Sequence, residues 1–205
     1  MIRILRNLDG NSDLNSRHEV HLVAAAVLDD VPPDLQWPLP RPIDQIAHHL
    51  GFGIRYVTVP DPVAFHGCLH NQQIYVSRNA APWLRRFTIG HELGHAYLWA
   101  GHAEWECNAF AEALLIPSDD VRSTTAQITE SPLPLQEWAR RELTDGAVTR
   151  LVQRYGVGYN ALISALGNYG CIRDVLPGTA RLTGDALFET YLQYYQALKG
   201  RDGPA

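Results

Sequence analysis

The chain has 205 residues, of which 46% are hydrophobic and 19% charged, and its formal net charge is −5. A chain of this length can bury a core without disulfides or a structural metal, so any bound metal is expected to serve chemistry. The acidic balance argues against a nucleic-acid-binding protein, which usually carries a clear basic excess.

Targeting and redox features predict a cytoplasmic protein without contact with a membrane. The apolar run over residues 20–28 is shorter than the roughly 20 residues of a membrane-spanning helix, and the mixed charges before it are wrong for a signal peptide. The three cysteines lie far apart and form no CxxC pair, at positions 68, 107 and 171. Such a sparse, odd set is typical of reduced thiols.

The first part of the chain predicts two helices followed by a small sheet. The helices cover residues 16–29 and, after a Pro-rich connector, residues 42–50, where Gly51 provides a stop. Segments of strand composition follow at residues 53–59, 64–70 and 72–77. A polar turn at Asn71 makes the last two segments a predicted hairpin.

Two adjacent helices are predicted after the sheet, followed by a mainly helical C-terminal region. The strongest helical pattern covers residues 82–99 and ends at Gly101, and an almost wholly apolar helix covers residues 103–116 and ends at Pro117. Residues 118–134 have loop composition. Further helices are predicted at residues 135–143, 145–155, 159–167 and 184–198, with an irregular stretch at 171–183.

These patterns predict an α+β fold that is mostly helical, with a small antiparallel or mixed three-stranded sheet. We expect a first domain over residues 1–125 that holds the N-terminal helices and the sheet. Residues 126–205 are expected to form a helical region, with a helix-turn-helix-like pair, that packs on that domain.

A His-Glu-Leu-Gly-His segment lies within the helix predicted over residues 82–99. His91 and His95 are four residues apart, so both imidazoles lie on one helix face and can bind one metal ion. Glu92 lies beside them, where its carboxylate can take a proton from a water molecule that the metal activates. The segment therefore predicts a metal-dependent hydrolase, with Zn²⁺ as the best-suited ion and Mn²⁺ as an alternative.

A third metal ligand is expected from the following helix. Gly101 lets the chain turn back, so the two helices should run antiparallel and Glu104 should lie level with His95. Glu106 competes for the role, but residues two apart on a helix differ by about 200° and cannot both face one ion. We prefer Glu104, because Asn108 lies on the same face and can hydrogen-bond a ligand.

Other polar residues near the motif have weaker claims on the site. Cys107 lies near the Glu104 face, but a lone buried cysteine more often packs as a small hydrophobic residue. His102 lies in the turn between the helices, where we expect it to be solvated. His66 and His70 on the hairpin are weak candidates for stabilising an oxyanion or contacting substrate.

Two segments together resemble the ImmA/IrrE family of metallopeptidases, namely residues 85–95 (RRFTIGHELGH) and 104–117 (EWECNAFAEALLIP). The second segment, with its Asn, Phe-Ala, Leu-Leu and closing Pro, separates this family from other proteins with an HExxH string. The resemblance extends over residues 40–170 and implies a zincin-like minimal metallopeptidase fold. It departs at Gly90 and Cys107, where alanine is common, and neither side chain should touch the metal.

The resemblance implies roles for four residues and a class of substrate. His91, His95 and Glu104 would bind the metal, and Glu92 would be the general base. Family members typically cleave a helix-turn-helix repressor, which switches on mobile-element or stress-response genes, and some pair with such regulators in toxin–antitoxin-like operons. We expect neither a fused N-terminal repressor-like domain nor a C-terminal sensor domain in this chain.

Two other function classes compete with the peptidase. Residues 151–162 have the helix–glycine turn–helix look of a DNA-reading motif, but the would-be recognition helix at 159–168 has no Lys or Arg. A packing role is therefore favoured over direct DNA binding. The remaining alternative is a non-catalytic or toxin–antitoxin-type module that holds a regulator, and the complete set of His91, Glu92 and His95 argues against it.

Overall fold

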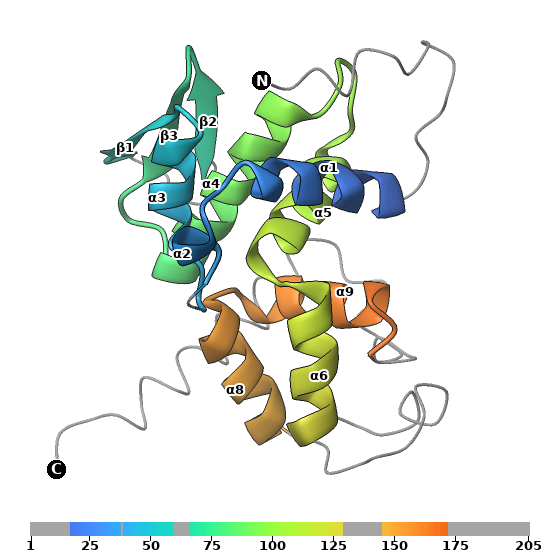
Figure 1. Ribbon diagram of the computed structural model, residues 1–205. Helices are drawn as coiled ribbons and strands as arrows, with labels where there is room; N and C mark the ends of the chain where they lie inside the picture. The colour runs from blue at the N-terminus through green and yellow to red at the C-terminus, as the bar shows by residue number, and fades with distance from the viewer. Residues whose placement is uncertain (1–16, 38, 60–65, 129–144, 172–205) are drawn as a thin grey trace, which may run out of the picture. The chain divides into compact units, whose positions relative to one another are not determined.

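The computed structural model describes residues 17–37, 39–59, 66–128 and 145–171, and Figure 1 shows its helices and strands. Within these residues the fold is α+β, as predicted, with eight helices and one three-stranded sheet. The chain divides into two compact units, Met1–Leu115 and Ile116–Ala205, each described by itself below. The helix that starts at Ser118 makes side-chain contacts with Tyr169 and Arg154 of the second unit, and the domain boundary at residue 125 stays a prediction.

The sheet of the first unit has the strand order β1-β3-β2. Its strands are β1 (Gly53–Val57), β2 (Gly67–His70) and β3 (Gln73–Ser77). β1 pairs with β3 in parallel, and β2 pairs with β3 as the predicted antiparallel hairpin. Asn71 and Gln72 have φ values of 47° and 59°, as the tight two-residue turn of a hairpin requires. β2 is thus an edge strand.

The first unit has five helices in its described residues, which pack on the sheet or on one another. They are α1 (Arg17–Asp29), α2 (Pro33–Gln36), α3 (Ile43–His49), α4 (Pro82–Tyr97) and α5 (Glu104–Leu115). α4 packs on β2 and β3 on one side and on α5 on the other, and α5 in turn packs on α1. Four of these helices were predicted. The short α2 was missed within the Pro-rich connector, although Pro33 suits a first helical turn.

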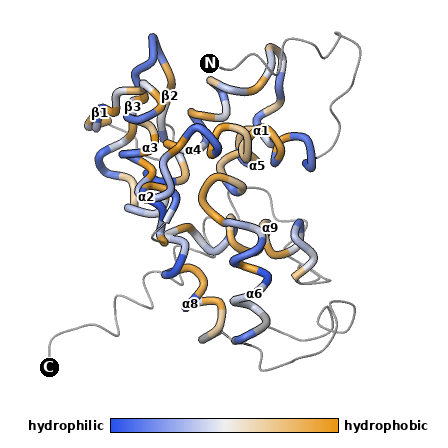
Figure 2. Tube along the Cα trace, in the orientation of Figure 1, coloured by the Kyte–Doolittle hydropathy of each residue, from blue (hydrophilic) through white to orange (hydrophobic). Residues whose placement is uncertain are grey.

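The hydrophobic residues of the first unit concentrate at the contact of α1, α4 and α5, and Figure 2 shows how they recur along α5. Two glycines of α4 let its backbone approach α5 closely. A methyl group at Gly90 would lie 3.2 Å from Ala111 Cβ, and one at Gly94 would lie 3.0 Å from Cys107 Cα. This close crossing sets the distance between the side chains of α4 and the start of α5.

Replacement of Gly94 by Val is expected to destabilise the protein, because a branched side chain must push the Cys107 backbone away from α4. Overpacking of this kind costs about 1–3 kcal/mol of the free energy of unfolding. Chemical denaturation monitored by circular dichroism measures the change. Ala96→Val, an exposed position on the same helix, is the matched control and should change stability by less than about 0.5 kcal/mol.

The second unit contains α6 (Ser118–Ile128), α8 (Asp145–Tyr155) and α9 (Tyr159–Asn168). α8 and α9 confirm two predicted helices, whereas the loop predicted from residue 118 was wrong as far as residue 128. Val121 and Thr125, four residues apart, are buried on one face of α6, so burial outweighs the weak helical propensity of its Ser and Thr residues. The predictions for residues 135–143 and 184–198, and for 171–183 beyond Cys171, lie outside the described residues.

An ion pair joins α6 to α8 within the second unit. Arg154 donates two hydrogen bonds to the Asp120 carboxylate, at 2.6 and 2.9 Å, and the Tyr155 hydroxyl donates a third at 2.8 Å. The hydrogen bonds from Arg154 above all lower the pKa of Asp120, against the opposing effect of burial. The contact therefore stabilises the folded protein at any pH above the pKa of an unfolded aspartate, about 3.9.

Asp120→Asn is expected to lower the free energy of unfolding by about 1–2 kcal/mol at pH 7, because Arg154 and Tyr155 lose their ionised acceptor. The difference from the wild type should shrink as the pH falls through the folded-state pKa of Asp120, where the wild-type carboxylate is itself protonated. Thermal melts from pH 7 to pH 3 measure both effects. Asp119→Asn, at a 97% exposed side chain, should be nearly neutral, and an equal loss there would contradict the assignment.

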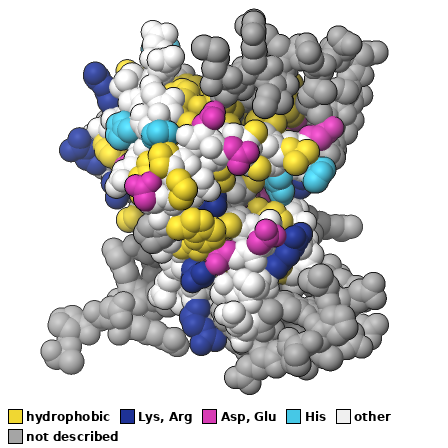
Figure 3. All heavy atoms as spheres, in the orientation of Figure 1, with side chains coloured by type: hydrophobic (Ala, Val, Ile, Leu, Met, Phe, Trp, Pro, Cys, Tyr) yellow, Lys and Arg dark blue, Asp and Glu magenta, His cyan; other side chains and the backbone are white. Residues whose placement is uncertain are grey.

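One face of the molecule carries charged side chains of both signs. On the face drawn in Figure 3, acidic and basic side chains lie among hydrophobic ones. α9, which would be the DNA-reading helix, contains no Lys or Arg. No helix in the described part of the chain combines the length and the apolar character needed to cross a membrane.

Candidate metal centre

α4 presents His91 and His95 on one face, as their spacing predicted. Their ring centroids are 4.8 Å apart and the ring planes are inclined at 78°. The side chains are 17% and 28% exposed, so both rings are largely packed yet reachable from solvent. Burial, together with the neighbouring His91, lowers the pKa of His95 and favours the neutral imidazole that binds metal ions.

Glu104, the first residue of α5, meets both imidazoles. Its Oε2 lies 3.2 Å from His91 Nε2, and its Oε1 lies 3.8 Å from His95 Nε2. The side chain is 78% exposed, so the two nitrogens and the carboxylate face solvent together. The structure therefore brings together the three residues that the sequence proposed as ligands.

Glu106, the competing carboxylate, has a different partner. Its side chain is buried and accepts a hydrogen bond from the Ala103 backbone N–H, just before α5 begins. Glu106 is the third residue of α5, and its carboxylate bonds to the backbone N–H of the residue before the helix. This is the glutamate half of a capping box. Glu106 thus holds the N-terminus of α5, which is where Glu104 is placed.

Asn108 lies one turn after Glu104 and contacts the first imidazole. Its Oδ1 is 2.9 Å from His91 Nδ1. A side-chain carbonyl oxygen can only accept, so His91 Nδ1 donates, and in the neutral ring Nε2 keeps its lone pair. The free lone pair is on the nitrogen that faces Glu104, as metal binding at this point requires.

Glu92 is buried between α4 and the edge strand β2. Burial raises its pKa to about 7; a hydrogen bond from the Leu69 backbone N–H opposes the rise, and the charge of Glu104 adds to it. Along an antiparallel pair of strands, residues whose backbone groups bond to the partner strand alternate with residues whose groups point away from it. The Ser77 N–H donates to the His66 carbonyl, so His66 is a bonded residue, and the backbone groups of Leu69, three residues later, point away from β3. The outer edge of β2 therefore runs directly beside the Glu92 carboxylate.

The donor set of two imidazole nitrogens and a carboxylate, open to solvent, suits a catalytic metal ion. The family model that matches residues 52–166 is a peptidase model described as the IrrE N-terminal-like domain, and the match covers more than half of the chain. The chain belongs to this family. Among curated proteins, none matches it. Membership confirms the resemblance drawn from residues 85–95 and 104–117 and supports a metallopeptidase-type function.

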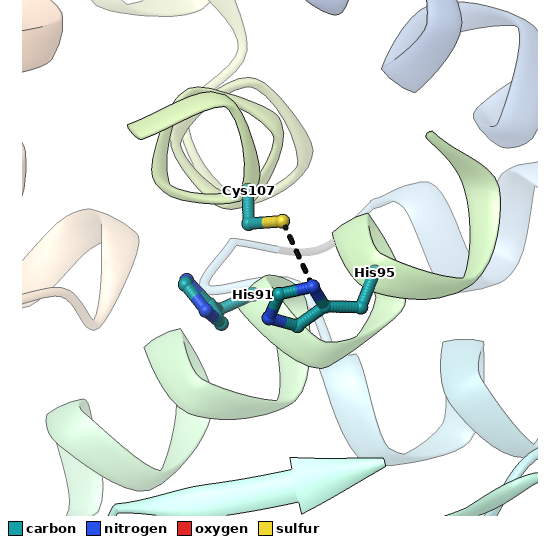
Figure 4. Close-up of side chains that lie close together, drawn as sticks. All are labelled: His91, His95 and Cys107. Carbon is teal, nitrogen blue, oxygen red and sulfur yellow. Dashed lines mark hydrogen bonds between the residues drawn. The ribbon is translucent and has the colours of Figure 1, made fainter. Parts of the chain in front are cut away.

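In this IrrE-like chain, Cys107 contacts an imidazole, although the sequence favoured a role in hydrophobic packing alone. Its Sγ is 3.4 Å from His95 Nδ1, and one donor atom each from His91, His95 and Cys107 lie within 4.8 Å of one another (Figure 4). Burial, followed by the charge of Glu104, raises the pKa of Cys107 to about 12. The thiol is therefore protonated at neutral pH and is a poor metal donor in this state.

His102 is the site residue that the sequence interpretation missed. It was expected to be solvated in the turn, but its ring is partly buried and its Nε2 lies 2.7 Å from His95 Nδ1. The turn at Gly101, with φ +88°, directs the chain back towards α4. That glycine was the available signal, because a sharp turn after a helix can bring the next residues back to its last turn.

The two hairpin histidines are not brought into the cluster of donor atoms found in the described residues. His66 is exposed, and its backbone carbonyl accepts the Ser77 N–H at the start of the hairpin. His70 is exposed at the end of β2, and its Nε2 lies 3.0 Å from the Asn71 side-chain amide. Neither contact indicates a role in stabilising an oxyanion.

Proposed function

We propose that the chain is a zinc-dependent endopeptidase of the cytoplasm that cleaves a helix-turn-helix transcriptional repressor and so derepresses stress-response or mobile-element genes. The observation that carries the proposal is the convergence of His91, His95 and Glu104, with the buried Glu92 carboxylate near enough for the charge of Glu104 to raise its pKa. Family membership supports the peptidase class of the reaction. The three cysteines, all unpaired, suit a reducing compartment.

His91 Nε2, His95 Nε2 and a Glu104 carboxylate oxygen would hold the metal ion. Two imidazoles and one carboxylate favour Zn²⁺ over the harder Mn²⁺. A bound Zn²⁺ would supply Lewis acidity towards the scissile carbonyl and lower the pKa of water to about 7. Cys107 also approaches the imidazoles, but its Sγ contacts His95 Nδ1, the nitrogen turned away from Glu104. We therefore favour Glu104 over Cys107 as third ligand.

Glu92 would move the proton. One face of its carboxylate is held by the Leu69 N–H, which orients the side chain next to the two imidazoles. A carboxyl group whose pKa lies near 7 can both take a proton from the attacking water and return it to the leaving amine. The burial that raises this pKa also excludes bulk water from the carboxylate.

The edge strand β2 offers a surface for the substrate. The backbone groups of Gly67 and the carbonyl of Leu69 face away from β3 and line the outer edge of the sheet, where Glu92 takes the Leu69 N–H. An extended peptide can pair with such an edge through main-chain hydrogen bonds, which fixes its register largely independently of sequence. A locally unfolded segment of the repressor would then lie across the three ligand side chains.

The experiment that tests this proposal is incubation of the purified protein with a helix-turn-helix regulator, sought first among the products of neighbouring genes. With stoichiometric Zn²⁺, mass spectrometry should detect discrete fragments, and a chelator should stop their formation. Intact regulator that stays in a stable complex with the zinc-loaded chain would contradict the peptidase proposal and favour a binding module instead. Parallel assays with Mn²⁺ test the preference for zinc.

A further inference from the structure

We propose that His102 is a positioning residue that sets the tautomer of His95 and thereby selects the nitrogen that His95 presents to a metal ion. The inference deepens the proposed function and rests on the metal site described above. It assigns a role to a side chain outside the ligand set. The argument depends on a chain of hydrogen bonds that runs from the backbone at Trp99 through His102 to His95.

The first link lies between His102 and the turn after α4. α4 ends at Tyr97, and Gly101 adopts a positive φ that turns the chain back. In the resulting conformation His102 Nδ1 lies 2.6 Å from the Trp99 backbone oxygen. A carbonyl oxygen has no proton to give, so His102 Nδ1 must be the donor. In the neutral ring, His102 Nε2 is then left as an acceptor.

The second link passes this constraint to the metal site. His102 Nε2 lies 2.7 Å from His95 Nδ1, with ring centroids 4.9 Å apart. Because His102 Nε2 can only accept, His95 Nδ1 must carry a proton, and His95 Nε2 must keep its lone pair. That nitrogen is the one directed at Glu104, at 3.8 Å, a distance too long for a hydrogen bond that would compete for the proton.

Cys107 explains why this selection is needed. Its Sγ lies 3.4 Å from the same His95 Nδ1, and a protonated thiol can donate to that nitrogen. A bond from Cys107 would place the ring proton of His95 on Nε2 and remove the lone pair from the metal site. His102 is closer and a better partner, so it decides between the two tautomers. His91 receives the same constraint from a different group, the Asn108 side-chain oxygen.

Nitrogen NMR of the metal-free protein labelled with ¹⁵N-histidine tests the proposal directly. At pH 8, above the ordinary imidazole pKa of about 6.5, wild-type His95 and His102 should both show a protonated Nδ1 and an unprotonated Nε2. His102→Phe should convert His95 to a mixture of tautomers. His102→Gln, whose side-chain carbonyl can still accept from His95 Nδ1, should retain the wild-type form. A wild-type His95 protonated on Nε2, or an unchanged tautomer in folded His102→Phe, would overturn the proposal.

Zinc affinity, measured by competition with a chromophoric chelator, gives the second readout. His102→Phe should weaken binding about 10–100-fold, the effect typical of a lost hydrogen bond to a ligand, and His102→Gln should weaken it less. His48→Phe replaces an exposed histidine of α3 and should leave affinity unchanged. Equal affinities for the wild type and folded His102→Phe would refute the role. If His102→Phe does not fold, the tautomer of His95 in the wild type and in His102→Gln decides whether the proposal holds. Neither readout requires cleavage, so a failed peptidase proposal would be recognised separately.

Discussion

Glu92→Gln is expected to abolish peptide hydrolysis while leaving the metal content of the protein unchanged. The amide has nearly the same size and can still accept the Leu69 N–H, but it cannot take a proton from water. Loss of a positioned general base lowers rates about 10²–10⁴-fold. Initial rates of regulator cleavage and the molar ratio of zinc to protein, measured on the same preparation, separate the two effects.

Glu106→Gln is the matched control for this variant. It changes another buried carboxylate to an amide, but one that caps α5 at Ala103 rather than facing the imidazoles. The amide oxygen can still accept the Ala103 N–H, which keeps Glu104 in place, so we expect a loss of at most about 1 kcal/mol in the free energy of unfolding and cleavage near the wild-type rate below the melting temperature. A Glu92→Gln protein that still cleaves would end the general-base assignment, whatever its metal content.

Glu104→Ala is expected to reduce zinc affinity by at least about 100-fold, more than the loss of a residue that only supports a ligand. Its carboxylate faces the Nε2 atoms of both His91 and His95, so its removal leaves two donors from one helix. The exposed side chain makes a folding defect unexpected. Chelator competition measures the affinity, and cleavage should fall with it.

Cys107→Ala distinguishes the two candidates for the third ligand. The thiol is buried and close to His95, so it is the rival donor in the described part of the chain. If Glu104 is the ligand, Cys107→Ala should bind zinc with wild-type affinity and keep its activity. Zinc loss in Cys107→Ala together with retention in Glu104→Ala would reverse the assignment and place the ion on the sulfur side of His95.

Local sequence patterns determined most of the scaffold around the site. The spacing of His91 and His95 requires a shared helix face once residues 82–97 are helical, because four residues make about one turn. Asn71 indicated the hairpin, and Gly101 indicated the turn that brings α5 back along α4. These features depend on neighbouring residues only, so they can be inferred without knowing the rest of the fold.

Contacts between segments distant in sequence decided the remainder. The choice between Glu104 and Glu106 depended on which carboxylate reaches the imidazoles of α4, and Glu104 does so across the contact of α4 with α5. The hydrogen bond from Leu69 to Glu92 joins an edge strand to a helix, a contact that no local pattern specifies. α6 formed despite its loop-like composition because its buried face and its ion pair with α8 stabilise it.

The sequence by itself predicted the residues of the proposed site, because two histidines four residues apart with a glutamate between them on one helix turn are typical of a metal-dependent hydrolase. Only the tertiary structure decided how each donor is oriented. The partners of His91 and His95, namely Asn108 and His102, reach them across a helix contact and a turn. Hydrogen-bond direction depends on separations of about 3 Å, which residue order cannot specify and which packing alone sets.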